Sequence, residues 1–353
     1  MDKAIISGIQ QVGIGIPSVY EAWAWYRKNF GFNIPIFDEA AEAPFMIPYT
    51  GNTVQSRHAI LAMNLGGGGG FEIWQYTSRE PQLPIFEPLL GDLGINIAKV
   101  KTSDIQKSFT ELKSAGVKML TDVVKDPNGQ EHFFVEDPYG NTFELVYGKD
   151  WFSRVKSTCG GLLGSIIGVS DIEKSLTLYR DILGYDEVVY DKTGQFEDLN
   201  ALKGGDKTFR RMLLTHSQER KGRFSKLLGP STIELIQVTD REPKKIFENR
   251  FWGDRGFIHL CFDVSNMKSL QAICEKGGYN FTVDSLDNFD MGEAAGHFSY
   301  IEDADGTLIE FVEAYRIPIM KKIGWYLNLQ KRAADKPLPA WMLKTLKFGA
   351  HKD

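Results

Sequence analysis

The segment IQQVGIGIPSVYEAWAWYRKNFGFN, residues 9–33, decides the fold because it recurs later in the chain as LLGSIIGVSDIEKSLTLYRDILGYD, residues 162–186. Each copy begins with an apolar run typical of a strand and, after a polar break, continues with apolar residues at helical spacing. Gly31 and Gly184 follow the two predicted helices, at the position where glycine most often ends a helix. A repeat of this kind predicts the architecture before single residues are considered.

Two further segments, residues 95–118 and 258–280, repeat the order strand, polar break, helix and glycine with different helix sequences. Strand-like runs follow each of the four helices, and the last run always contains a glutamate. These glutamates are Glu72, Glu144, Glu234 and Glu310. The second and fourth copies also share a hairpin, EDPYGNTFELV and EDADGTLIEFV. The sequence therefore predicts four βαβββ modules, arranged as a duplicated pair.

The composition is ordinary for a globular protein of about two domains, with 353 residues, 42% of them hydrophobic and 25% charged. A formal charge of −5 gives no general excess of positive charge for nucleic-acid binding, so a small-molecule partner is expected. The three cysteines are scattered and form no C-x-x-C pair, which favours a reducing compartment. Neither a signal peptide nor a membrane span is recognisable, and we expect a cytoplasmic protein without integral membrane association.

Four βαβββ modules with a glutamate on each final strand resemble the vicinal oxygen chelate superfamily, which includes glyoxalase I, bleomycin resistance proteins and extradiol dioxygenases. The resemblance covers about residues 5–315. It implies an α+β fold in which the modules pair into two glyoxalase-like domains with cupped mixed sheets. We expect modules 1 and 2 in residues 1–153, modules 3 and 4 in residues 154–315, and a basic, amphipathic helical extension in residues 316–353.

In this superfamily a divalent metal lies inside the cup, bound by His or Gln of each first strand and by Glu of each last strand. Side chains alternate along a strand, so the position that faces the cup is found by counting back from the helix of each module. For modules 1 to 4 the count gives, in order, Gln11, Ile97 or Asn96, Gly164 and His259. The resemblance thus implies a metal bound by His259, Glu310 and Glu234 in the second cup. A weaker second site would consist of Gln11, Glu72 and Glu144. Oxygen ligands with one imidazole suit Fe²⁺, Mn²⁺, Zn²⁺ or Ni²⁺, and Gly164 would leave room for substrate or water.

Three function classes remain open. The first is a glyoxalase-like lyase or isomerase, in which the metal stabilises an enolate of a small carbonyl substrate and Glu310 or Glu234 moves the proton. The second is an Fe²⁺ extradiol ring-cleaving dioxygenase, suggested by Tyr300 ten residues before Glu310 but weakened by Gly164, which removes one histidine. The third is a non-catalytic small-molecule binding protein of the resistance type, with cups lined by residues such as Trp74 and Tyr76.

Other residues have weaker candidate roles. Arg57, Arg210 and Arg211 fall on matching strands of modules 1 and 3, where a guanidinium could bind a substrate carboxylate. The extension contains nine Lys and Arg residues but only two Asp residues. Its apolar spacing predicts two short helices, the first with Ile319, Ile323, Tyr326 and Leu327 and the second with Met342, Leu343, Leu346 and Phe348. We expect it to pack on the acidic body or on a second copy in a homodimer; the alternative is transient contact with an anionic membrane surface.

Overall fold

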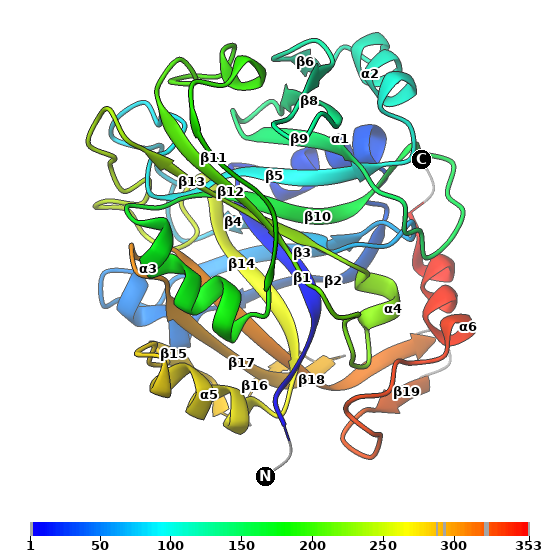
Figure 1. The fold of residues 1–353 in the computed structure, drawn as a ribbon. Helices are drawn as coiled ribbons and strands as arrows, with labels where there is room; N and C mark the ends of the chain where they lie inside the picture. The colour runs from blue at the N-terminus through cyan, green and yellow to red at the C-terminus, as the bar shows by residue number, and fades with distance from the viewer. Residues whose placement is uncertain (1–2, 287–288, 292–293, 321–324, 352–353) are drawn as a thin grey trace.

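The computed structural model describes residues 3–286, 289–291, 294–320 and 325–351, which form two large curved sheets with helices at their margins. Helices α1 and α2 lie together at one end of the molecule, and α3 and α5 lie together at another (Figure 1). The largest buried cluster draws apolar side chains from these four helices and from both sheets. The two sheets therefore share one hydrophobic core.

The four βαβββ modules and the α+β fold class are confirmed. Module 1 consists of β1 (Ile5–Gly15), α1 (Val19–Phe30), β2 (Ile34–Glu42), β3 (Ser56–Met63) and β4 (Gly70–Tyr76), with a 3₁₀ helix, Pro44–Tyr49, after β2. Module 2 consists of β5 (Gly94–Thr102), α2 (Ile105–Ser114), β6 (Lys118–Met119), β8 (Glu131–Glu136) and β9 (Thr142–Tyr147), with the short β7 (Val124–Lys125) beside β8.

Module 3 consists of β10 (Cys159–Gly168), α3 (Ile172–Leu176), which continues as a π-helical turn, β11 (Glu187–Gly194), β12 (Phe209–Thr215) and β13 (Thr232–Val238), with α4 (Ser225–Leu228) before β13. Module 4 consists of β14 (Gly256–Ser265), α5 (Met267–Lys276), β15 (Val283–Asp284), β17 (Ala294–Glu302) and β18 (Leu308–Met320), with β16 (Phe289–Met291) beside β17. Gly31 ends α1 in the left-handed conformation, as its position predicts.

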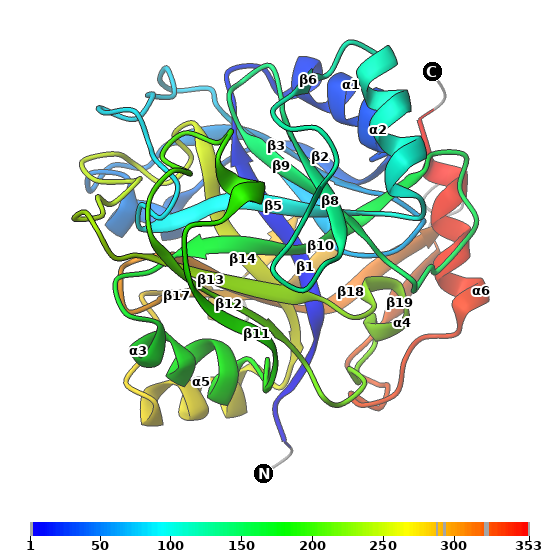
Figure 2. The same ribbon diagram turned by 45° about the horizontal axis from the view of Figure 1, so that its top comes forward.

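The modules are paired as expected, but the two modules that share a sheet are not the consecutive ones expected to share a cup. One sheet has the order β15-β17-β18-β14-β1-β4-β3-β2 and joins module 4 to module 1; the other has the order β11-β12-β13-β10-β5-β9-β8-β6 and joins module 3 to module 2 (Figure 2). The first strands meet in antiparallel pairs, β1 with β14 and β10 with β5. Any of the four first strands offers a similar apolar edge, so strand patterning alone does not specify its partner.

The helices, in contrast, pack within each half of the sequence. Tyr26 of α1 donates a 2.6 Å hydrogen bond to Asp137 in the last hairpin of module 2. Tyr179 of module 3 donates a 2.8 Å hydrogen bond to the equivalent Asp303 of module 4. Each half is therefore held together by helix contacts, whereas each sheet joins the two halves. The boundary after residue 153 stays a prediction.

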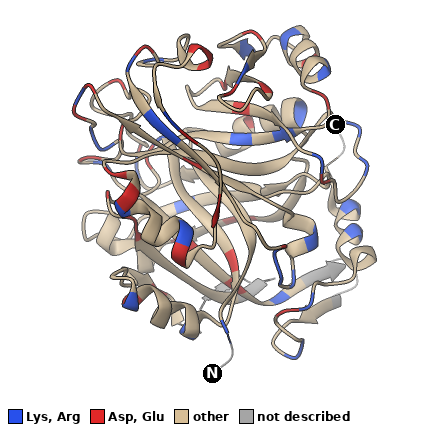
Figure 3. Cartoon of the chain, viewed as in Figure 1, with Lys and Arg blue, Asp and Glu red and all other residues tan. Residues whose placement is uncertain are grey.

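The C-terminal extension differs from the prediction in its first part. Tyr326 and Leu327 lie on β19 (Trp325–Asn328), which pairs with the end of β18, where Ile319 lies; Ile323 is outside the described residues. The unpaired edge of the long β18 gives this segment backbone partners that a helix would not use. The second predicted helix is present as α6 (Ala340–Leu343), followed by a 3₁₀ turn over Lys344–Gly349. The blue positions on this C-terminal segment, at the right of Figure 3, are its basic residues.

The apolar side of this extension packs on its own chain. Leu338, Met342 and Leu343 belong to a buried cluster with residues of β2, β3 and α4. Within the described part of the chain, no helix is both long and apolar enough to span a membrane.

Candidate metal centre

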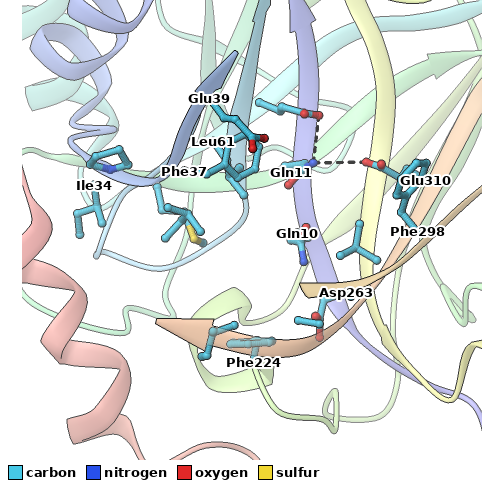
Figure 4. A pocket seen from close by; sticks show the side chains of 18 of the residues that line it. Gln10, Gln11, Ile34, Phe37, Glu39, Leu61, Phe224, Asp263, Phe298 and Glu310 are labelled. Carbon is cyan, nitrogen blue, oxygen red and sulfur yellow. Dashed lines mark hydrogen bonds between the residues drawn. The ribbon is translucent and has the colours of Figure 1, made fainter. Parts of the chain in front are cut away.

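Four side chains from neighbouring strands of the first sheet converge on its concave face. They are Gln11 of β1, Glu72 of β4, His259 of β14 and Glu310 of β18. Nε2 of His259 lies 3.2 Å from Glu72 Oε2 and 3.1 Å from Glu310 Oε2. The Gln11 amide donates to the same two carboxylate oxygens at 3.2 and 3.4 Å (Figure 4). Glu72, His259 and Glu310 each offer a ligand atom, all within 4.8 Å of one another.

Local features of β1 make this convergence possible. The strand pairing shifts by one residue between Ile9 and Gln11, so the consecutive side chains of Gln10 and Gln11 both reach the same cavity. Gly13 lies opposite His259 on one side and Glu72 on the other. A Cβ atom at Gly13 would lie 2.5 Å from the His259 ring, so only glycine leaves space for the buried imidazole.

The charges of the centre perturb two of its groups. Burial alone would lower the pKa of His259, but Glu310 and Glu72 raise it to about 10. Tyr300, which lies directly opposite Glu310 on β17, is buried beside the same carboxylates. Burial and this negative charge raise the pKa of Tyr300 well above its usual range. The phenol therefore keeps its proton and can serve as a hydrogen-bond donor.

The residues present fit a divalent cation. Among the described residues, the buried atoms Gln11 Oε1 and His259 Nδ1 and Nε2 have no hydrogen-bond partner of normal geometry. A half-turn of the Gln11 amide would direct its oxygen toward the position that its NH₂ group now faces. Two carboxylates, an amide oxygen and one imidazole form a donor set suited to Mn²⁺, Fe²⁺, Zn²⁺ or Ni²⁺.

The equivalent position in the second sheet holds an ion-pair network. The ammonium group of Lys99 lies between Glu144 Oε2 at 2.7 Å and Glu234 Oε2 at 2.6 Å. Arg211 binds the other oxygen of Glu234 at 2.7 Å, and His132 binds the other oxygen of Glu144 at 2.6 Å. Asp198 closes the network by contacting both Arg211 and His132. All six side chains are buried.

Strand register explains the difference between the two centres. Glu310 lies opposite Cys261 in the first sheet, and Glu144 lies opposite Lys99 in the second. Two residues earlier, His259 in one sheet corresponds to the apolar Ile97 in the other. Gln11 corresponds to Gly164, because these residues pair with Cys261 and Lys99 respectively. The second centre therefore lacks two of the four donors, and a cationic side chain occupies the space between its glutamates.

The expected grouping of ligands is corrected by these positions. Glu234 does not lie with His259 and Glu310; it lies with Glu144 around Lys99. Of the three residues assigned to a weaker site, Gln11 and Glu72 instead lie with His259 and Glu310. Both errors have one cause, the assumption that consecutive modules share a cup.

The remaining first-strand candidates have structural contacts. Gly164 leaves no room for substrate, because a Cβ atom there would lie 1.9 Å from the backbone oxygen of Thr232. Asn96 bonds to the backbone of the preceding loop, and Ile97 is buried in an apolar cluster. The sequence analysis did not identify Lys99 as a residue of the second centre. The available signal was strand alternation, which directs Lys99 to the same face as Ile97 two residues earlier.

A cavity of about 1010 Å³ adjoins the first centre. Gln11, Glu72, Tyr300 and Glu310 form part of its wall, together with the buried Asp263. Trp74 and Tyr76, expected as ligand-contacting residues, instead pack in an aromatic cluster with Trp252. Of the three candidate arginines, Arg57 lines the cavity, Arg210 is paired with surface carboxylates and Arg211 belongs to the second centre.

Comparison with known proteins defines the class. The family model of the Glyoxalase/Bleomycin resistance protein/Dioxygenase superfamily matches residues 8–145 and 162–311. The chain belongs to this superfamily. No match was found among curated protein sequences.

Solved structures with the same fold are distant in sequence. Glyoxalase I from Zea mays is 12% identical, with 87% of this chain and 92% of that chain covered and a TM-score of 0.54. A putative dioxygenase from Bacillus subtilis is 14% identical, with 99% and 98% covered and a TM-score of 0.57. These likenesses support the fold alone.

Proposed function

We propose that the protein is a metal-dependent lyase or isomerase of the glyoxalase type that acts on a carbonyl substrate in the cavity of the first sheet. The observation that carries this proposal is the convergence of Glu72, His259 and Glu310 within 4.8 Å at the cavity wall. With Gln11, these residues would hold the divalent metal. A cation bound there would polarise the substrate carbonyl and stabilise the negative charge that develops on its oxygen.

Each neighbouring group then has a role consistent with its environment. Glu310 is the proposed base for the proton next to the carbonyl, because its carboxylate faces the cavity beside Gln11, His259 and Tyr300. Tyr300 lies in the cavity wall next to Glu310 and can donate a hydrogen bond there, since its phenol stays protonated. Glu234 has no place in this chemistry, because it is fully buried in the second sheet beside Lys99 and Arg211.

The donor set argues against the ring-cleaving dioxygenase. Non-haem Fe²⁺ oxygenases use two histidines and one carboxylate and leave positions open for their substrates. Here the described cluster has one histidine, two carboxylates and an adjacent amide. The purely binding alternative predicts that no metal is needed and that substrate protons are not exchanged.

Metal binding and proton exchange test the proposal in turn. The metal-free protein is loaded with Mn²⁺, Fe²⁺, Zn²⁺ or Ni²⁺ and the retained metal is measured after desalting, with His259→Ala as the variant expected to lose it. A panel of α-hydroxy carbonyls and thioesters in D₂O is then followed by NMR for exchange of the proton next to the carbonyl. Glu310→Gln should lower this exchange by about 10²- to 10⁴-fold.

Glu144→Gln is the matched control, because Glu144 occupies the same register position in the second sheet. It should retain both metal and exchange. Retention of no metal by the wild-type protein would refute the proposal. Oxygen uptake with a catechol would support the dioxygenase instead.

A further inference from the structure

The cavity beside the first centre is polar at one end and apolar at the other. What we call the polar end has the amide and carboxylates of the centre, Gln11, Glu72 and Glu310. Figure 4 shows Gln10 and Asp263 further along the same wall, with Phe298 beside Glu310 and Phe224 beside Asp263. The opposite end is formed by side chains of β2, β3, α4 and α6 that belong to one buried apolar cluster: Ile34, Met63, Leu227, Leu228, Met342 and Leu343. The described residues thus build one chamber with two chemically different ends.

The apolar end is built largely from two short segments, α4 and the C-terminal segment. Helix α4 is fixed where it borders the cavity, since the Leu227 backbone oxygen accepts a 2.9 Å hydrogen bond from Gly68. The C-terminal segment forms the adjoining wall with Met342, Leu343, Leu346 and the backbone to Ala350. It is anchored by a 2.8 Å hydrogen bond from His351 N to Asn33 O. This segment lies outside the four βαβββ modules.

The size of the cavity is informative as well. Its volume of about 1010 Å³ lies at the upper end of the range for small-molecule sites, roughly 300–1,000 Å³. A substrate consisting only of a small carbonyl group would fill the polar end and leave the space at the apolar end to water. Replacing that water by an apolar group is favourable, because it removes apolar surface from contact with water.

We propose that the substrate is amphipathic: a head with two adjacent oxygens at the Gln11–Glu72–His259–Glu310 centre and an apolar tail that lies between α4 and the C-terminal segment. This inference rests on the proposed function and adds the substrate class. The tail contributes binding energy through burial, while the head alone contacts the reacting groups. The C-terminal segment is then a specificity element, since its residues contact only the tail.

A series of alkyl hydroxamates tests the inference without knowledge of the natural substrate. Hydroxamates carry two adjacent oxygens that chelate divalent metals, and their alkyl chain can be lengthened from acetohydroxamate through hexano- and octano- to decanohydroxamate. Binding of Mn²⁺ is measured first by electron paramagnetic resonance, and hydroxamate affinity for the Mn²⁺-loaded protein is then measured by calorimetry. Each methylene buried in the apolar end should tighten binding about fourfold.

Two substitutions at one wall position probe the tail end. Leu346 is partly buried and faces the cavity, so Leu346→Asp should remove the dependence on chain length while leaving acetohydroxamate affinity unchanged. Leu346→Trp narrows the cavity without adding charge and should weaken only the longest members. Trp341→Asp is the control, because Trp341 is 60% exposed on α6 and does not line the cavity.

The outcomes separate the two proposals. If Mn²⁺ does not bind, the proposed function fails and the inference fails with it. If acetohydroxamate binds the Mn²⁺-loaded protein but longer chains bind no tighter, the inference alone is overturned. An unchanged chain-length dependence in both Leu346 variants would overturn the assignment of the tail to the C-terminal wall. Loss of that dependence in Leu346→Asp, and weaker binding of only the longest members in Leu346→Trp, with neither change in Trp341→Asp, supports the inference.

Discussion

Replacing Lys99 by methionine tests whether the second centre stabilises the fold. Lys99 is 4% exposed, and its ammonium group lies within 2.7 Å of carboxylate oxygens on both Glu144 and Glu234. Methionine has a similar length but no charge, so two buried carboxylates would lose their shared partner. Breaking a buried ion pair by removing one member typically costs about 3–5 kcal/mol. We expect a loss of this size in the free energy of unfolding.

The expected loss can be converted into a melting temperature. The entropy of unfolding is roughly 2.1 cal/mol/K per residue, or about 0.7 kcal/mol/K for 353 residues. Lys99→Met should therefore lower Tm by about 4–7 °C. Urea unfolding followed by circular dichroism gives the free energy, and differential scanning calorimetry gives Tm.

Lys118→Met is the matched control for this experiment. Lys118 forms an ion pair of similar length, 2.7 Å, with Glu136, but its side chain is 64% exposed. Exposed pairs typically contribute about 1 kcal/mol or less. The reasoning is refuted if Lys99→Met and Lys118→Met shift the urea midpoint equally, because burial would then make no difference.

Three further predictions concern single side chains. Partners Asp198 and Glu144 outweigh burial and raise the pKa of His132 to about 9, so its stabilisation is full below about pH 6.5 and is lost as pH rises through 9. In the wild type the free energy of unfolding, measured with urea, should decline by roughly 3 kcal/mol across that pH range, and His132→Gln should lack this decline. Burial raises the pKa of Asp263 to about 7, so folding favours its protonated form and stability falls as pH rises from about 4 to 7. At pH 8 Asp263→Asn should therefore have a higher free energy of unfolding than the wild type, by up to about 4 kcal/mol. Urea unfolding should show this difference shrinking toward pH 4. Gly13→Ala should displace the His259 ring, which its Cβ would approach to 2.5 Å, and should weaken Mn²⁺ binding measured by electron paramagnetic resonance; unchanged affinity would contradict this account of Gly13.

The repeat made most of the fold predictable. Alternating strands, helix spacing and the glycines after the helices recur four times, so the modules and the glutamate of each last strand follow from local patterns. Which modules share a sheet did not follow, because that depends on which apolar strand edges meet across the whole chain. That choice changed the partner of every candidate ligand, and the residues of each site were regrouped as a result.

The extension shows a second limit of local patterns. Tyr326 and Leu327 have a spacing that fits a helix, but they lie beside the free edge of β18, which runs on to Met320. Hydrogen bonding to that edge overrides the helical pattern. The second helix follows its apolar spacing, because Met342 and Leu343 are buried against side chains of the same chain and no free strand edge competes for this segment among the described contacts.

Charge balance connects the two centres. Duplication placed two glutamates at equivalent positions in both sheets, and buried carboxylates need compensating positive charge. In the second centre the chain itself supplies it: Lys99, Arg211 and His132 face Glu144, Glu234 and Asp198. In the first centre the position of Lys99 is occupied by Cys261. Among the described residues, Glu72 and Glu310 contact Gln11 and His259, and the uncharged Cys261 and Tyr300 also hydrogen-bond to Glu310. A metal-binding histidine is neutral, so two negative charges would then remain for an external cation. The same backbone thus supports a self-compensated structural network in one sheet, and in the other a centre whose charge a divalent metal would match.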